Sequence, residues 1–146
     1  MLRKIGLLSF IWMILAGMLI SGCTKEKKSG KAEITGHELV LKQDGPNSFA
    51  VNARGKVKNV GSTDLKNIVI TGYCRSCQEM FVNGRWFISD VEKTPDQKAI
   101  INYLATGSEK AFEFKGIAFY FSQSGKKPEK LPENIQIVIE SFEVAD

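Results

Sequence analysis

The sequence predicts an all-β domain, an antiparallel β-sandwich of about seven strands, which follows an apolar leader and a short polar tether. From Ala32 onward, short runs alternate apolar with polar residues, as is typical of strands with one buried face. Gly, Pro, Asn and Asp separate these runs, and these residues favour turns. No segment of the domain is amphipathic over a length that would indicate a helix. Together these observations favour two stacked sheets.

The first two strands are expected on either side of a turn at residues 44–47, which read Asp-Gly-Pro-Asn. Pro fixes φ, and Gly and Asn tolerate positive φ. A candidate first strand covers residues 38–41. The second strand has one apolar and one polar face, because Phe49, Val51, Ala53, Gly55 and Val57 alternate with Asn52, Arg54, Lys56 and Lys58.

A chain reversal at residues 59–64 leads into a third strand at residues 65–73, which is rich in β-branched residues. Within the reversal, the Asn59 side chain can bond its own backbone, and we expect Gly61 to adopt a positive φ. The reversal should therefore be tight, and the next strand should begin directly in the core.

A β-hairpin is expected between residues 80 and 91, around Asn83 and Gly84. Asn-Gly flanked by apolar residues is the strongest short-range hairpin signal. Residues 94–97 form a loop with room for a short helical turn, and residues 99–104 form another strand.

Residues 110–121 are expected to form a strand whose buried face changes at Gly116, since a glycine at a change of face indicates a bulge. The spacing places the phenylalanines in the core, and they form a binding surface only if two faces of the strand are exposed. A polar loop at residues 122–133 and a last strand, from 135 to about 144, complete the domain. The expected core set of the phenylalanine strand is Phe112 and Phe114 before the glycine, then Ile117, Phe119 and Phe121.

Residues 1–22 have the pattern of a secretory signal peptide. Arg3 and Lys4 precede a 16-residue run, from Ile5 to Ile20, that is broken only by two glycines and a serine. A membrane-spanning helix is the alternative, but a span needs about 20 apolar residues. The run is short for a span and fits a cleaved leader.

Ile20, Ser21 and Gly22 directly before Cys23 resemble the lipoprotein box of bacterial lipoproteins. The resemblance implies that the Cys23 thiol receives a diacylglycerol, that the chain is cut before Cys23 and that the new amine is acylated. Each buried methylene contributes roughly 0.8 kcal/mol, so two or three chains would hold the protein firmly at the membrane. The expected organisation is a signal peptide (1–22), a lipidated tether (23–31) and a β-sandwich (32–146), anchored on the extracytoplasmic side, either periplasmic or at the cell surface.

The charge balance gives no indication of nucleic-acid binding. Two of the 20 Lys and Arg residues lie in the leader, which leaves 18 against 16 acidic residues. This excess is too small to form an electrostatic footprint for nucleic acid. Much of it lies at residues 24–31, which lack apolar residues and indicate a solvated spacer.

With Cys23 used by lipid, Cys74 and Cys77 remain, and an even remainder in an oxidising compartment favours pairing. A structural disulfide is one interpretation. A redox pair is another, because Arg75 would favour a thiolate, although no βαβ pattern surrounds the motif. A zinc site would need two more ligands, and His37 is the only histidine. His37 beside Glu38 is interpreted as a solvated residue, since no nucleophile accompanies it.

Residues 51–70 contain the order Gly-x-Val-x-Asn-x-Gly, then Leu-x-Asn-Ile-x-Ile. This order resembles FxLYD and LEA14-like domains, and Gly107-Ser108-Glu109 followed by Phe112 and Phe114 fits their second half. The resemblance implies an immunoglobulin-like β-sandwich of a kind common in secreted and lipid-anchored bacterial proteins. It carries over no catalytic residues. Where such domains have a Tyr-Asp-x-x-Gly turn, this chain has Tyr73 followed by Cys74, a departure.

We therefore expect a non-enzymatic module without cofactor or metal that binds or scaffolds a protein of the cell envelope. An edge strand or the loops at one end would provide the surface. The candidate binding residues are Asn83, Arg85 and Trp86, although Trp86 equally suits a cover over one end of the core. The rival hypothesis is a thiol–disulfide protein that uses Cys74 and Cys77, and a third is carriage of a small ligand between the sheets.

Overall fold

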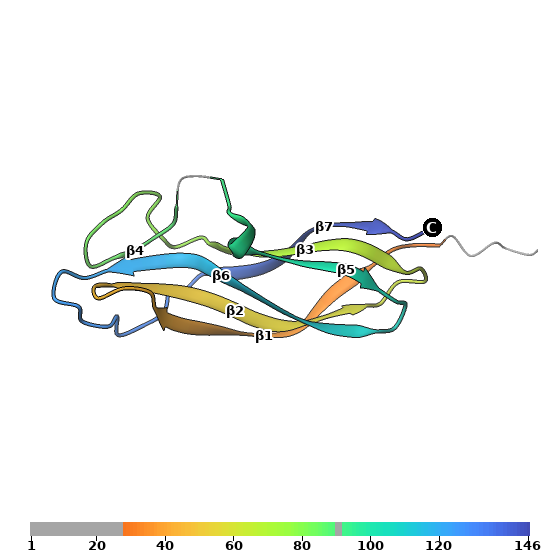
Figure 1. Cartoon of the computed structure of the whole chain (residues 1–146), viewed down its shortest axis with the longest axis horizontal. Coiled ribbons are helices and arrows are strands. Elements are labelled where there is room, and N and C mark those ends of the chain that lie inside the picture. Colours follow the sequence, from red (N-terminus) through yellow and green to blue (C-terminus); the bar gives the residue numbers. More distant parts are fainter. Residues whose placement is uncertain (1–27, 90–91) are drawn as a thin grey trace, which may run out of the picture.

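The computed structural model describes residues 28–89 and 92–146, and the predicted leader and Cys23 lie outside these residues. Within these residues, seven strands form two antiparallel sheets, one with the order β1-β2-β6-β4 and one with the order β5-β3-β7 (Figure 1). The predicted β-sandwich is therefore confirmed. The elements are β1 (Ala32–Gln43), β2 (Ser48–Asn59), β3 (Leu65–Cys74), β4 (Trp86–Phe87), the 3-10 helix η1 (Pro95–Gln97), β5 (Lys98–Leu104), β6 (Glu109–Phe121) and β7 (Ile135–Val144).

The core lies between the two sheets and is built from aliphatic and phenylalanine side chains. Val51, Leu65, Ile68 and Leu104 are fully buried, and Phe114 is nearly so. Burying one such side chain contributes roughly 1.5–3 kcal/mol to folding. Side chains alternate between the two faces of a strand, and in β3 every second residue from Ile68 to Cys74 points into the core.

The reversal after β2 is held by Asn59, as predicted. Its fully buried side chain donates from Nδ2 to the carbonyls of Thr63 (2.8 Å) and Leu104 (3.0 Å), and its Oδ1 accepts from the Gly61 N–H (3.0 Å). The expected positive φ at Gly61 is wrong, since among the described glycines only 84, 107, 116 and 125 have one. Gly61 is needed for a different reason: a Cβ there would lie 2.5 Å from the Ser29 carbonyl oxygen.

The predicted hairpin around Asn83 and Gly84 does not form. Asn83-Gly84 does turn the chain, with Gly84 at φ 72° and the Arg85 N–H donating to the Val82 carbonyl (3.2 Å). However, Gly84 donates its N–H to Phe121 (2.8 Å), and β4 pairs with β6 instead of with residues 80–82. The long β6 is already fixed by β2, so it is a better partner than a short local segment.

The bulge at Gly116 is confirmed, with φ 67° at that residue. Phe114 pairs with Ala53 and Ala118 pairs with Val51, so β6 uses two more residues than β2 over this interval. An insertion of two residues preserves the alternation of a strand, whereas an insertion of one reverses it. The predicted change of the buried face is therefore confined to Ile117, which is buried as predicted, and is wrong for the residues beyond it, where Ala118 lies in the core and Phe119 does not.

As a result, the phenylalanines of β6 divide between the two faces of the sheet. Phe112 and Phe114 are buried in the core, and so is Ile117. Phe119 and Phe121 are only half-buried and lie outside the core cluster; Phe119 pairs with Ala50 of β2 and with Phe87 of β4. The expectation that Phe119 and Phe121 belong to the core is wrong, and this places aromatic side chains on the outer face.

The two ends of the sandwich differ in what they carry (Figure 1). At one end, residues 29–31 lie against the β2–β3 turn, where Val60 donates to the Lys31 carbonyl (2.9 Å) and Ser62 donates to the Ser29 carbonyl (3.0 Å). The β1–β2 turn and the loops that follow β3 and β6 lie at the opposite end. The chain therefore enters the domain at one end, and the long loops gather at the other.

Candidate binding groove

Two adjoining hollows lie on the outer face of the β2, β6 and β4 strands. The first, here called the aromatic pocket, has a volume of about 620 Å³ and is lined by Met80, Phe81, Phe87, Phe119 and Phe121 among others. The second, the polar pocket, has a volume of about 490 Å³ and is lined in part by Lys42, Asn52, Asp96 and Gln97. Both include Ser89 and Phe119, so the two pockets adjoin, and together they are here called the groove.

The aromatic pocket is a cluster of edge-packed rings with an exposed rim. The Phe81 ring centre lies 5.2 Å from that of Phe87 and 5.5 Å from that of Phe121, both in edge arrangements. Phe81 nevertheless remains 58% exposed, and the neighbouring Met80 is 73% exposed. Contiguous exposed apolar side chains of this size mark interaction sites more often than ordinary surface.

Trp86 points the other way, towards the core. It packs against the core cluster, its ring lies 5.3 Å from that of Tyr120, and its Nε1 donates to the Lys130 carbonyl (3.0 Å). Asn83 and Arg85 are exposed in the turn beside it. The structure thus brings the predicted binding residues together, with Asn83 and Arg85 on the surface and Trp86 half-buried.

Met80 and Phe81 were not among the predicted binding residues, although they are the most exposed apolar side chains near the groove. The signal that could have found them is the run Met80-Phe81-Val82 directly before Asn83-Gly84. The predicted hairpin uses this run as one of its arms. An apolar run that fails to pair with a strand is left on the surface.

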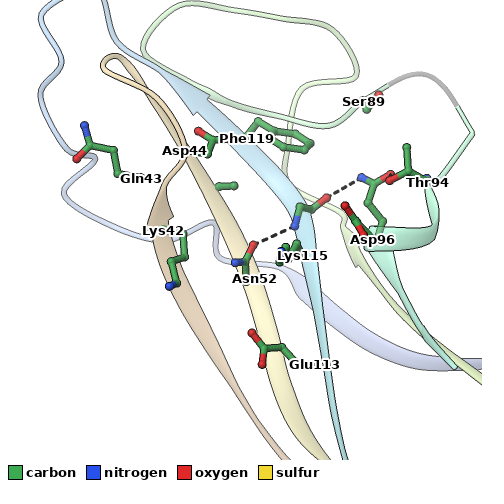
Figure 2. A pocket seen from close by; sticks show the side chains of 13 residues that line it. Lys42, Gln43, Asp44, Asn52, Ser89, Thr94, Asp96, Glu113, Lys115 and Phe119 are labelled. Carbon is green, nitrogen blue, oxygen red and sulfur yellow. Dashed lines mark hydrogen bonds between the residues drawn. The ribbon is translucent and has the colours of Figure 1, made fainter. Parts of the chain in front are cut away.

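The floor of the polar pocket is the β6 bulge, held from both sides by buried amides (Figure 2). Asn52 accepts the Gly116 N–H at its Oδ1 (3.1 Å), and Gln97 donates from Nε2 to the Gly116 carbonyl (2.7 Å). Gln97 in turn accepts the Thr94 N–H (2.9 Å), which closes the predicted helical turn, η1. Asn52 was expected on the solvent side of β2, but it is only 7% exposed.

Cys74 and Cys77 form a disulfide with their Cα atoms 5.5 Å apart. Cys74 is 6% exposed and belongs to the core cluster, and Cys77 packs against that cluster. Arg75 lies over the Tyr73 ring, 4.9 Å from its centre, and donates to the Gln136 side chain (3.2 Å). Its guanidinium therefore has partners other than the sulfur atoms.

Lys93 forms a second cationic contact with Tyr73, 4.6 Å from the ring centre. Its ammonium donates to the Gly72 carbonyl (2.6 Å), next to the disulfide. Partial burial lowers the pKa of the Lys93 ammonium, and the nearby Glu140 carboxylate partly opposes this. The contact fastens the segment before η1 to β3.

Within residues 28–89 and 92–146, no group of three His, Cys, Asp or Glu side chains is arranged to hold a metal ion. His37 is exposed on β1, opposite Gly55. In the same part of the chain, no helix has the length and apolar character needed to span a membrane.

Comparison with protein-family models, with curated proteins and with solved structures found no match. The resemblance to FxLYD and LEA14-like domains therefore stays a prediction from the sequence, while the two-sheet architecture rests on the structure itself.

Proposed function

We propose that this protein is a lipid-anchored, extracytoplasmic and non-enzymatic binding module that holds a protein of the cell envelope in its outer-face groove. The observation that carries the proposal is the exposed rim of the aromatic pocket, Met80 and Phe81, on a cluster of ordered phenylalanine rings. Methionine and aromatic residues are enriched at protein–protein interfaces. The polar pocket beside it would provide the polar part of such an interface.

The position of the groove supports a partner other than the anchoring membrane. Ser29 is already bonded to the domain, so only residues 24–28 would separate it from a lipidated Cys23. These residues reach at most about 20 Å when extended. The 13 residues of β6, two of which are taken up by the bulge, pair along residues 48–58 of β2 and span about 35 Å, and the aromatic pocket lies at the far end of that strand.

The same lengths exclude the tether as the occupant of the aromatic pocket. A segment that leaves the domain at Ser29 and extends for about 20 Å cannot reach a pocket roughly 30 Å away. The occupant of the aromatic pocket must therefore come from another molecule. A polypeptide fits best, because one groove offers aromatic side chains in one half and both amides and charges in the other.

The surroundings of the disulfide support a structural role in preference to the rival redox function. A catalytic disulfide must be reached by its substrate, and its attacking thiolate is normally stabilised by a cation or a helix N-terminus. Cys74 is buried at the end of a strand, and Arg75 is engaged by Tyr73 and Gln136. The disulfide then serves to hold the start of the loop that carries Met80 and Phe81.

Site-specific photocrosslinking in intact cells tests the proposed groove. A photoreactive phenylalanine analogue replaces Phe81 in one strain and Phe142 in another. Phe142 is a matched control, since it is an exposed phenylalanine (38%) at the tether end. We expect a discrete protein adduct from position 81 and none of the same mass from position 142.

The partner identified by mass spectrometry is then purified and its affinity measured. We expect Phe81→Ser to weaken binding at least tenfold, about 1.4 kcal/mol, and Phe142→Ser to leave it unchanged. Adducts with lipid only, adducts with a second copy of this chain, or equal loss in both variants would reject the proposal. The anchor is tested separately: a palmitate analogue should label the wild type and not Cys23→Ala.

A further inference from the structure

We propose that the polar pocket is a binding site for a short peptide or amino acid in its zwitterionic form, with the carboxylate at Asn52 and Lys42 and the ammonium towards Asp96. This site goes beyond the proposed protein partner, because it requires only the polar half of the groove. The pocket volume of about 490 Å³ is ample for a dipeptide.

The first observation is a buried amide with an unused donor. Asn52 is 93% buried, and its Oδ1 is occupied by the Gly116 N–H. Its Nδ2 donates to no other described residue, and no side-chain nitrogen in the described residues is both fully buried and without a partner. This NH₂ group therefore keeps access to solvent in a residue that lines the pocket, and it can bond an acceptor oxygen there.

The second observation is that a lysine and an aspartate lie on opposite sides of Asn52. Lys42, from β1, lies on one side of Asn52, and Asp96, from η1, lies on the other (Figure 2). Neither makes an ion pair with another residue in the described ranges. A ligand with a carboxylate at one end and an ammonium at the other would complement both walls.

The remaining walls set the character of the ligand. Ala50 and Phe119 add apolar surface to the lining, which suits a side chain or the carbon skeleton of a peptide. Asp44, Glu113 and Lys115 also line the pocket, so it is not a purely anionic or cationic site. An inorganic anion or a simple cation would meet unfavourable charge on one wall.

The rigidity of the floor favours specific binding. The Gly116 bulge is fixed by hydrogen bonds from two elements, Asn52 of β2 and Gln97 of η1. A preformed site loses less conformational entropy on binding than one that must be ordered. The donor of Asn52 is thus held at a defined place before any ligand arrives.

The test is an NMR titration of the purified full-length protein with the dipeptide Ala-Phe, and with the same dipeptide acetylated and amidated at its ends. We expect the zwitterion to bind in the millimolar range or tighter, and to shift the Asn52 side-chain amide and the Gly116 backbone amide signals. Blocking both ends should weaken binding at least tenfold. Equal binding of the two forms, or no shift of these signals, overturns the proposal.

Substitutions define the site further. Asn52→Asp keeps an acceptor for the Gly116 N–H and removes the free donor, and Asp96→Asn alters an exposed side chain. Each should weaken the dipeptide at least tenfold, and so should Lys42→Gln. Lys58→Gln, on an exposed position of β2, is the matched control and should have no effect.

The outcome is independent of the proposed protein partner. Dipeptide binding that survives Phe81→Ser, and is lost in Asp96→Asn, supports the site even if no partner is found at the aromatic pocket. A dipeptide that binds equally to all three pocket variants and the control overturns the site, while the crosslinking result from position 81 stands on its own.

Discussion

Gly61 lies so close to Ser29 that a Cβ at position 61 would be 2.5 Å from the Ser29 carbonyl oxygen. Side chains do not make such short contacts to backbone, so Gly61→Ala requires residues 29–31 to move away from the turn. We expect the free energy of unfolding to fall by about 1–3 kcal/mol. Urea denaturation measures the loss, and faster proteolysis before Lys31 would report the released segment.

Gly36→Ala is the matched control for this substitution. A Cβ at Gly36 would meet nothing within 4 Å, and Gly36 does not have a positive φ. The substitution should leave stability unchanged or raise it by up to about 1 kcal/mol, because alanine restricts the unfolded chain. Equal losses in both variants would contradict the close contact at Gly61.

Asn59 is expected to be among the most sensitive positions of the fold. Its side-chain NH₂ bonds the carbonyls of Thr63 and Leu104, and both would lose their partner in Asn59→Ala. Leaving buried polar groups unsatisfied costs about 1–3 kcal/mol each, so we expect a total loss of about 2–4 kcal/mol in chemical denaturation. A loss below about 1 kcal/mol would mean that water replaces the amide.

The disulfide is expected to stabilise the fold without being needed for binding. The ring closed by Cys74 and Cys77 is short, so loop-closure entropy gives at most about 3 kcal/mol. The double variant with Ser at both positions should melt at a lower temperature than the oxidised wild type. Its melting temperature should match that of the wild type measured in the presence of a reductant. Partner binding at low temperature should persist, whereas loss of binding in a folded double variant would favour the redox hypothesis.

Asp64 and Tyr103 should make stability depend on pH at both extremes. The Tyr103 hydroxyl donates to the Asp64 carboxylate, which also accepts the Thr106 N–H (2.8 Å). These bonds lower the pKa of Asp64 from 3.8, chiefly through Tyr103, and raise the pKa of Tyr103 from 10.0, chiefly through Asp64.

The signs follow from these directions. The contribution of Asp64 to the free energy of unfolding is fully present above pH 3.8 and is lost as the pH falls through its lower pKa in the folded state. The contribution of Tyr103 is fully present below pH 10.0 and is lost as the pH rises through its higher pKa in the folded state. Unfolding measured across pH should show both losses in the wild type. Asp64→Asn should flatten the acid side, and Tyr103→Phe the alkaline side.

The exposed rim of the aromatic pocket should be replaceable without loss of fold. Phe81→Ala should change the free energy of unfolding by less than about 1 kcal/mol, since Phe81 is 58% exposed. Phe112→Ala removes a ring that is 5% exposed and should cost about 3–5 kcal/mol. Thermal melting compares the two, and a large loss in Phe81→Ala would assign the ring to the core.

The strands and most turns could be predicted because their signals are local. The period-two pattern of residues 49–57, the Asn59 reversal and the β-branched segment around Ile68 each depend on neighbours in sequence. The hairpin around Gly84 failed because a distant strand, β6, offered better pairing. Local propensity cannot detect such a competitor.

The groove was harder to predict than the fold. The alternating pattern of β2 predicts that a polar residue such as Asn52 faces solvent. In the structure Asn52 is bonded to the Gly116 bulge, and that bulge is bonded in turn to Gln97 of η1, 45 positions after Asn52. The outward position of Phe119 depends on how many residues the bulge adds. The sequence marks the glycine, but the number of extra residues is set by the pairing with β2.

The bulge in β6 adds two residues, and this even number lets the pocket floor change without changing which face the later residues of the strand occupy. Since the β6 bulge adds an even count of residues, every side chain beyond it keeps its orientation whether the bulge is present or absent. Deleting Gly116 and Ile117 would therefore erase the pocket floor while every later β6 residue still faces the same side, although the core would lose the buried Ile117 side chain. The two-residue insertion thus adds a pocket floor to the outer face and one apolar side chain to the interior without turning the aromatic end of the strand over.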